Sequence, residues 1–221
     1  MQKMDRLCCK NKVNHKTPHV DFNKYIINMI KNTIQLLAKI SNWKFIIPFF
    51  LFTAFWLYLF NVGQKEMSKI AGEEVVLIDL WSGYDLEEIT AFFELLKPEG
   101  RAIHQQLTGI NDMIFPFAYG PLLILVFALI LKNIFEKNSK WLLLSLFPLL
   151  TMGVDYLENF NTLLMLKSYP NISEVIVNKG SFFTEIKNLS TLIIKISFIL
   201  LSIVWIAKMV RNFVIKKENK L

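Results

Sequence analysis

The sequence has few residues of the kinds that build disulfide frameworks, histidine metal sites or glycine-rich phosphate loops. Its only cysteines, Cys8 and Cys9, are adjacent, so they cannot join distant parts of the fold. We expect reduced thiols, with acylation and metal binding as the alternatives. The three histidines are scattered, and no glycine-rich phosphate loop, His-Glu metal spacing or Gly-x-Ser-x-Gly motif is present. We therefore expect neither a bound metal nor a cofactor.

Apolar residues are abundant instead. Hydrophobic residues make up 53% of the 221-residue chain and aromatic residues 14%, which is too apolar for an ordinary soluble domain of this size. Four uncharged or nearly uncharged runs are long enough to cross a bilayer as helices. They lie at residues 45–62, 113–131, 141–162 and 189–207. The sequence predicts an all-α fold, a four-helix transmembrane bundle, with the lipid bilayer as its main partner.

The N-terminal region, residues 1–42, is basic. Residues 1–22 have no periodicity and are expected to be a disordered tail. Residues 23–40 alternate apolar and basic or amide residues at helical spacing, which predicts an amphipathic helix. This helix either lies along an anionic membrane surface or packs on the bundle. The membrane domain then covers residues 43–210, and residues 211–221 form a basic tail.

Residues 63–111 form an acidic insert between the first two spans, with nine Asp and Glu against four Lys and Arg. Asp85 and Glu88 have the spacing of a capping box, and apolar residues follow at helical spacing until Pro98. This predicts one short amphipathic helix. A second helix is expected to start near Arg101 and to run into the second span, where Pro116 predicts a kinked or widened start.

The distribution of basic residues indicates the orientation. The N-terminal region, the turn after the second span and the C-terminal tail together contain seventeen Lys and Arg, whereas the insert and the connection at 167–188 contain seven. Both termini are therefore expected in the cytoplasm, with the insert outside. The net charge of +7 follows this pattern rather than one basic face, so we expect no nucleic acid as a partner.

The most unusual feature is a set of charged residues inside the spans, because such residues are costly in a bilayer. With a rise of about 1.5 Å per residue, the orientation places Asp155, Lys195 and Tyr119 at one depth in the outer half. Glu158 and Asn159 follow one turn further out, and Asp112 lies at the outer mouth. These six residues are the candidate cluster for a ligand or an ion.

Two interpretations of this cluster stay open. In the structural one, Asp155 pairs with Lys195, and Tyr119, Asn159 and the backbone freed by Pro116 satisfy the remaining polar groups. In the functional one, the three acids exceed the single lysine by two charges, so some are protonated or a cation or basic ligand joins them. Arg101 and His104, just outside, are candidates for part of the missing positive charge.

Four short motifs, taken together, indicate a resemblance to other proteins. They are Gly83-Tyr84 before an acidic helix, Gly100-Arg101 before His104, Asp112-Met113-Ile114-Phe115-Pro116 followed by Tyr119, and Asp155-Tyr156-Leu157-Glu158-Asn159. As a set they resemble a group of uncharacterised bacterial four-span integral membrane proteins, over roughly residues 45–210. The resemblance implies a four-helix fold with an external insert in a bacterial inner membrane, and it implies no activity.

Two classes of function fit these observations. The first is a membrane protein that binds a small ligand, a cation or a proton, and the second is an enzyme that acts on a lipid or isoprenoid with Asp155 or Glu158 as acid or base. Binding is favoured, because no nucleophile or metal motif accompanies the acids. A purely structural or interaction protein is the third alternative. No inverted repeat is visible, so an alternating-access carrier would require a homo-oligomer.

Overall fold

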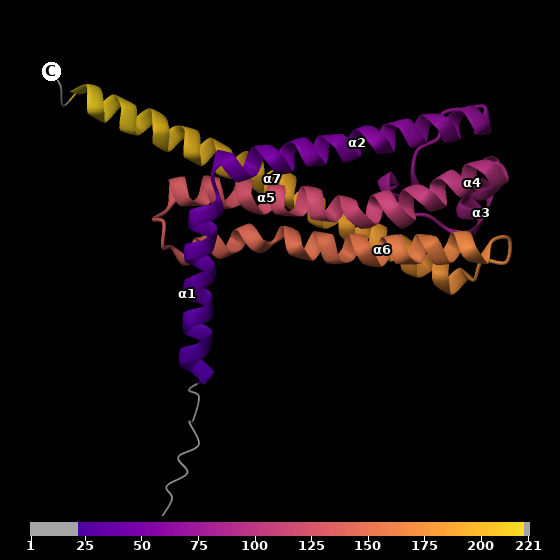
Figure 1. Cartoon of the computed structure of the whole chain (residues 1–221), viewed down its shortest axis with the longest axis horizontal. Helices are drawn as coiled ribbons and strands as arrows, with labels where there is room; N and C mark the ends of the chain where they lie inside the picture. The colour runs from indigo at the N-terminus through magenta and orange to yellow at the C-terminus, as the bar shows by residue number, and fades with distance from the viewer. Residues whose placement is uncertain (1–21, 219–221) are drawn as a thin grey trace, which may run out of the picture.

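The computed structural model describes residues 22–218, which form helices joined by short loops, with no strand within that range (Figure 1). The elements are α1 (Phe22–Ile40), α2 (Trp43–Ala71), η1 (Ile78–Leu80), α3 (Leu86–Leu95), α4 (Lys97–Gln106), η2 (Leu107–Asn111), α5 (Asp112–Ile134), η3 (Lys140–Leu146), α6 (Pro148–Ser168) and α7 (Glu174–Glu218). Four helical stretches are long and apolar enough to cross a membrane. The all-α prediction is confirmed. Most of the predicted basic tail, with Cys8 and Cys9, lies outside the described residues.

The four long helices lie side by side (Figure 1). α2 packs against α5, α6 packs against α7, and α5 also contacts α6 and α7. The loop between α6 and α7 and the segment from η1 to α4 lie at one end of the bundle, which we call the insert end. α1 lies across the opposite end, which we call the α1 end. The C-terminal part of α7 extends beyond that end, so both ends of the described chain lie on the same side.

α2 shows why a hydropathy window underestimates the length of a helix. Its N-cap is Asn42, whose side chain accepts a hydrogen bond from the backbone N–H of Lys44. The helix ends at Ala71, where Gly72 adopts the left-handed conformation with φ of +86°. Its 29 residues span about 43 Å, more than the roughly 30 Å of a bilayer core. α2 therefore continues from the predicted end at Val62 into the insert.

The insert shares an apolar core with the adjoining ends of α2, α6 and α7. α3 has the predicted capping box, in which Asp85 accepts from the Glu88 N–H and the Glu88 carboxylate accepts from the Asp85 N–H. Met67, Ile89 and Phe93 are fully buried between α2, α3 and α4. α4 runs through the π-helical turn η2 directly into α5, as predicted for the helix through His104. The helix is widened at 107–111, before the second span, whereas Pro116, at which a kinked or widened start is predicted, lies within the continuous helix α5.

The last two spans differ from the prediction at their starts. The segment predicted at 141–162 begins as the 3₁₀ helix η3 and continues as α6 to Ser168. The predicted connection at 167–188 is mostly helical, because α7 already begins at Glu174. Polar side chains lower the hydropathy of residues 174–188, yet this part of α7 packs against α6 and α3, so it stays helical.

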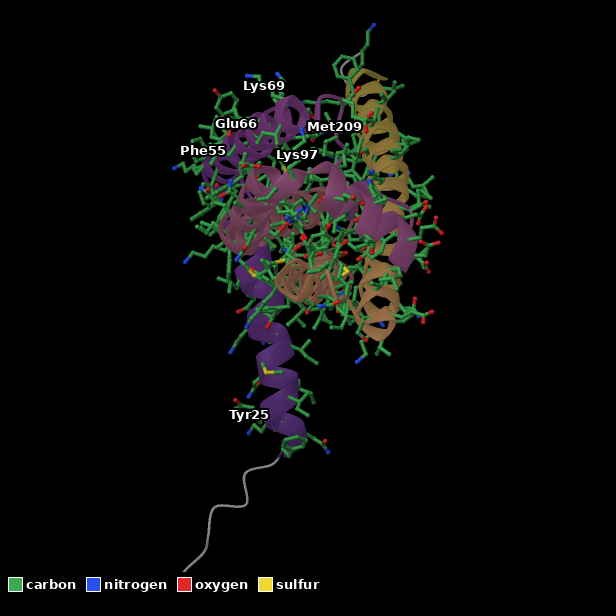
Figure 2. All side chains as sticks on the ribbon, turned by 90° about the vertical axis from the view of Figure 1, so that its right-hand side faces the viewer. Tyr25, Phe55, Glu66, Lys69, Lys97 and Met209 are labelled. Carbon is green, nitrogen blue, oxygen red and sulfur yellow. The ribbon has the colours of Figure 1, made fainter. Side chains whose placement is uncertain are left out.

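α1 crosses the end of the bundle instead of running along it (Figure 1). Ile34 and Leu37 in its C-terminal half pack on Leu131 and Leu142 of the bundle. The Lys132 ammonium donates to the backbone carbonyls of Ala38 and Ser41, where a cation is favourable at the end of a helix. The N-terminal half, with Tyr25, projects away from the bundle (Figure 2). Packing therefore holds one half of α1, and contact of the other half with a membrane surface stays a prediction.

Candidate functional site

One face of α6 carries polar side chains that the bundle buries. Each member of this polar stripe is at most 5% exposed. The stripe consists of Thr151, Asp155, Glu158, Asn159 and Thr162. Their spacing of three or four residues puts them on one side of the helix. The prediction that Asp155 and Glu158 share an inward face is therefore correct.

Lys187 of α7 is the cation that both acids of this stripe share. Its ammonium forms an ion pair with the Glu158 carboxylate and lies 3.8 Å from a carboxylate oxygen of Asp155. It also lies 3.8 Å from the carboxylate of Asp79, which η1 contributes from the insert. The Thr184 hydroxyl donates to the other Glu158 oxygen at 2.5 Å. One buried ammonium thus links three carboxylates from α6 and the insert.

The predicted partner of Asp155 was Lys195, and this pairing is wrong. Lys195 lies two turns further along α7, and its side chain is exposed and forms no ion pair within residues 22–218. The error follows from the assigned start of the last span. The apolar run of the last span begins only at Leu189, so hydropathy places Lys187 in the preceding connection, whereas α7 begins at Glu174 and includes it.

α5 completes the cluster on its other side. The Tyr119 hydroxyl donates to Asp155 at 2.7 Å, which confirms that these two side chains meet. The Asn159 side-chain amide donates to the backbone carbonyl of Asp112 at 3.0 Å. Pro116 has no N–H to offer that carbonyl, so Asn159 satisfies an acceptor that the proline leaves open. The expected use of Asn159 is therefore found in the structure.

A cavity of about 300 Å³ lies beside the cluster. Its lining comes from η1, α5, α6 and α7 and combines charged, aromatic and aliphatic side chains. It includes Asp79, Asp112, Asp155, Lys187 and Lys195, the rings of Phe115 and Tyr119, and Leu80, Leu123 and Ile194. The cavity thus joins the membrane helices to the insert, and it reaches four of the six residues that the sequence singled out.

Asp112 is the acid of this cavity that lacks a counter-ion. Asp112 is 8% exposed and forms no ion pair within residues 22–218. Lys187, the ammonium group nearest the acids, pairs instead with Asp79, Asp155 and Glu158. A buried carboxylate without a cation is unfavourable in a low-dielectric surrounding. Four carboxylates therefore meet two ammonium groups, and the excess of acid that the sequence predicted persists after Asp79 and Lys187 are added.

Arg101 and His104 do not supply the missing charge. The Arg101 guanidinium donates to the Phe93 carbonyl and lies 4.4 Å from the centre of the Tyr169 ring, away from the cavity. His104 is buried with its ring against Phe92 and Phe93, and apolar surroundings disfavour a charged imidazole. It borders only a separate hollow of about 10 Å³, room for one water molecule, that also touches Asp112.

The loop before α3 fixes the insert to α7. The Tyr84 N–H donates to the Ser181 hydroxyl at 2.9 Å, and the Asn188 amide donates to the Trp81 carbonyl at 2.7 Å. The Tyr84 ring lies against Gly180, where a Cβ would overlap with it. Burial raises the pKa of Tyr84 to about 12. These contacts hold Asp79 over the cavity.

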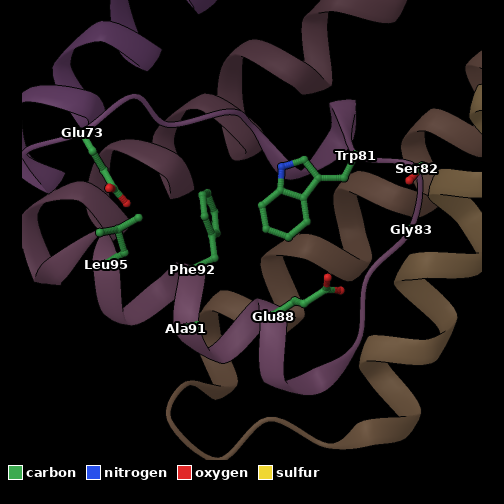
Figure 3. Close-up of a pocket in the computed structure, with 8 residues that line it drawn as sticks. All are labelled: Glu73, Trp81, Ser82, Gly83, Glu88, Ala91, Phe92 and Leu95. Atoms are coloured by element: carbon green, nitrogen blue, oxygen red, sulfur yellow. The ribbon is translucent and has the colours of Figure 1, made fainter.

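A second hollow lies on the outer surface of the insert (Figure 3). It is a wide depression of about 710 Å³, with the Phe92 and Trp81 rings in the middle of its wall and Glu73 and Glu88 at opposite ends (Figure 3). Glu88 already accepts the backbone N–H of Asp85 in the capping box, and Glu73 is exposed. This depression offers a ligand few preorganised polar groups, so the cavity beside the polar stripe is the stronger candidate.

The residues missed from the sequence include Asp79, Thr184 and Lys187, together with Thr151 and Thr162 of the polar stripe. Thr184 and Lys187 could have been found, because polar residues at 184, 187, 188, 191 and 195 recur at helical spacing and continue a stripe through the predicted start of the last span. Asp79 carries no such signal, since only the folding of the insert brings η1 onto the bundle.

The described residues include no group of three or more His, Cys, Asp or Glu side chains arranged to hold a metal ion. Comparison of the chain with protein-family models, with curated proteins and with solved structures finds no match. The resemblance of its motifs to bacterial four-span proteins therefore stays a prediction, and the function has to be argued from the site itself.

Proposed function

We propose that this multi-pass membrane protein binds a small organic cation, one with an ammonium group, in the cavity between η1, α5, α6 and α7. Asp112 carries the proposal, because it is a buried carboxylate on the cavity wall without a paired cation in the described chain. A bound ammonium would provide that cation. Lys187 would position Asp79 and Asp155 at the same wall.

The composition of the wall favours an organic cation over a metal ion. The rings of Phe115 and Tyr119 lie with their centres 5.0 Å apart on α5 and both border the cavity. Aromatic faces attract ammonium groups, and the aliphatic residues Leu80, Leu123 and Ile194 suit a small carbon skeleton. A magnesium or calcium ion would instead need several converging oxygen ligands.

The two other interpretations explain less of the site. A structural network accounts for the ion pairs of Lys187 but leaves Asp112 without a counter-ion among residues 22–218. An enzyme acting on a lipid or isoprenoid is the less economical interpretation, because it assigns no role to the unpaired Asp112 at the cavity wall. Protonation of Asp112 is the simplest competitor, and the test below separates it from ligand binding.

Orientation and location form part of the same proposal. On the distribution of basic residues we place both ends of the chain in the cytoplasm of a bacterium, with the insert outside the inner membrane. The cavity would then take its ligand from the outer half of the bilayer or from the external side. In intact cells, an impermeant thiol reagent should label a cysteine at Glu74 and not one at Lys137.

The ligand class can be tested on the full-length protein in an uncharged detergent. We expect methylammonium to raise the midpoint of thermal unfolding at millimolar concentration, since a ligand that binds only the native state stabilises it. Methanol, potassium and magnesium at equal ionic strength should raise it less. Asp112→Asn should remove the methylammonium effect, and Glu99→Gln, at an exposed acid of α4, should keep it.

Each alternative gives a different result. If Asp112 is simply protonated, methylammonium has no more effect than potassium at any pH from 6 to 9. If magnesium stabilises the protein most and Asp112→Asn abolishes that effect, the site holds a metal ion. A modified lipid found by mass spectrometry in membranes that overproduce the protein would establish an enzyme instead.

A further inference from the structure

Lys195 is the second charge of the cavity without a partner. It lies in the hydrophobic part of α7, where the residues around it are mostly Ile, Leu and Phe. Its side chain borders the cavity, is exposed on the bundle surface and forms no ion pair within residues 22–218. A lysine within the hydrocarbon region is costly unless it reaches water or an anionic group.

Asp112 and Lys195 therefore present opposite charges to one cavity without pairing with each other. Asp112 comes from the start of α5 and Lys195 from α7, and no salt bridge joins them. Asp155 and Asp79, the other acids of the wall, are linked through Lys187. A simple cation would satisfy Asp112 and leave Lys195 unchanged.

We infer that the natural ligand is a zwitterion, whose ammonium group meets Asp112 and whose anionic group, a phosphate or carboxylate, meets Lys195. This rests on the proposed cation site and names the class of its ligand. A phosphate on an ammonium-bearing chain has this chemistry, and it occurs both as a free small molecule and as the headgroup of a phospholipid. The exposure of Lys195 on the lipid-facing surface allows either source.

Three probes separate the two charges. Methylammonium tests the acid side, inorganic phosphate the lysine side, and phosphoethanolamine both. We expect phosphoethanolamine to bind about tenfold more tightly than methylammonium, as one added charge-assisted hydrogen bond contributes at least that factor. Lys195→Met should remove this advantage without weakening methylammonium binding, because it takes a like charge away from the cavity wall. Lys208→Met, further along α7, should alter neither, since its ammonium caps the Ile134 carbonyl outside the cavity.

The source of the ligand is tested in nanodiscs. A headgroup ligand predicts a higher unfolding temperature in phosphatidylethanolamine than in phosphatidylglycerol discs, with the difference lost in Lys195→Met. A free ligand predicts no lipid difference and retained binding of phosphoethanolamine. The inference is overturned if phosphoethanolamine binds no better than methylammonium. It is also overturned if Lys195→Met keeps the tenfold advantage, because the Lys195 ammonium would then contact water and not the ligand. Failure of methylammonium itself would instead overturn the proposed cation site.

Discussion

α2 and α6 are both long apolar helices of one bundle, yet they differ in what they bury. α2 exposes most of its aromatic and aliphatic side chains, including Phe50, Leu57 and Tyr58, and buries few residues in its membrane part. α6 exposes Leu150, Leu157 and Phe160 and buries its polar stripe. One helix is defined by contact with lipid, and the other by polar contacts inside the bundle.

Hydropathy therefore identifies the membrane spans, whereas buried polar residues identify the candidate functional site. A lipid-facing residue of α2 can be exchanged for another apolar residue at little cost, since lipid and side chain are equally apolar. Each polar residue of α6 needs a particular partner at a particular height. Substitutions in α6 and in its partners should therefore have larger effects than matched substitutions in α2 or at exposed positions.

The largest effect is expected for Lys187→Met. Removing the ammonium leaves Asp79, Asp155 and Glu158 without their shared cation, and breaking a buried ion pair from one side costs about 3–5 kcal/mol. Unfolding in mixed micelles of increasing denaturing detergent would measure the loss. Much of it should be recovered by Glu158→Gln in the same chain.

Two matched lysine variants on α7 complete this experiment. Lys179→Met replaces an exposed lysine nearer the insert end, and Lys195→Met replaces the lysine that the sequence had paired with Asp155. Both are expected within about 0.5 kcal/mol of the natural protein. A loss from Lys195→Met as large as that from Lys187→Met would show that the sequence-based pairing was correct and the structural one was not.

Sequence patterns predicted the features that depend on nearby residues and missed those that depend on tertiary contacts. Periodicity and hydropathy are local, so they located the four spans, the Asp85 capping box and the inward face of α6. The start of α7 was misplaced because residues 174–188 are polar and only packing against α6 and α3 reveals them as bundle residues. Asp79 could not be predicted, because the tertiary folding of the insert alone brings it to Lys187.

Gly180→Ala tests the close contact between α6, α7 and the insert. An added Cβ would lie 2.5 Å from the Asn161 amide nitrogen and would overlap the Tyr84 side chain. We expect a loss of about 1–3 kcal/mol from this overpacking. Gly153→Ala on α6 is the control, because nothing lies within 4 Å of its Cβ position, and it should be neutral or slightly stabilising. Equal effects of the two variants would contradict the packing described for Gly180.

Tyr119→Phe removes the hydroxyl that donates to Asp155. Interhelical hydrogen bonds in membranes contribute about 0.6 kcal/mol on average and up to about 1.7, and we expect a value near the upper end because the acceptor is a carboxylate. Tyr58→Phe on α2 is the matched control, since its ring is 65% exposed, and it should change nothing. A Tyr119→Phe protein as stable as the Tyr58→Phe protein would show that Asp155 does not depend on this bond.

Tyr84 has no expected effect near neutral pH, and its contribution appears only at high pH. Burial raises its pKa to about 12 from the ordinary value of 10, so the fold favours the neutral phenol. Its contribution to stability is fully present below pH 10 and is lost as the pH rises through 12. Absorbance at 295 nm should show a tyrosinate step near pH 12 in the folded protein, absent from Tyr84→Phe. A titration complete by pH 10.5 would contradict the burial of Tyr84.

The central claim is that the unpaired Asp112 makes the α5–α6–α7 cavity a site for an ammonium group. Equilibrium dialysis of the full-length protein against ¹⁴C-methylammonium tests it most directly. The account predicts one saturable site in the natural protein and in Glu99→Gln, and none in Asp112→Asn, although all three unfold alike. Equal binding by Asp112→Asn, or no saturable binding by the natural protein, would contradict it.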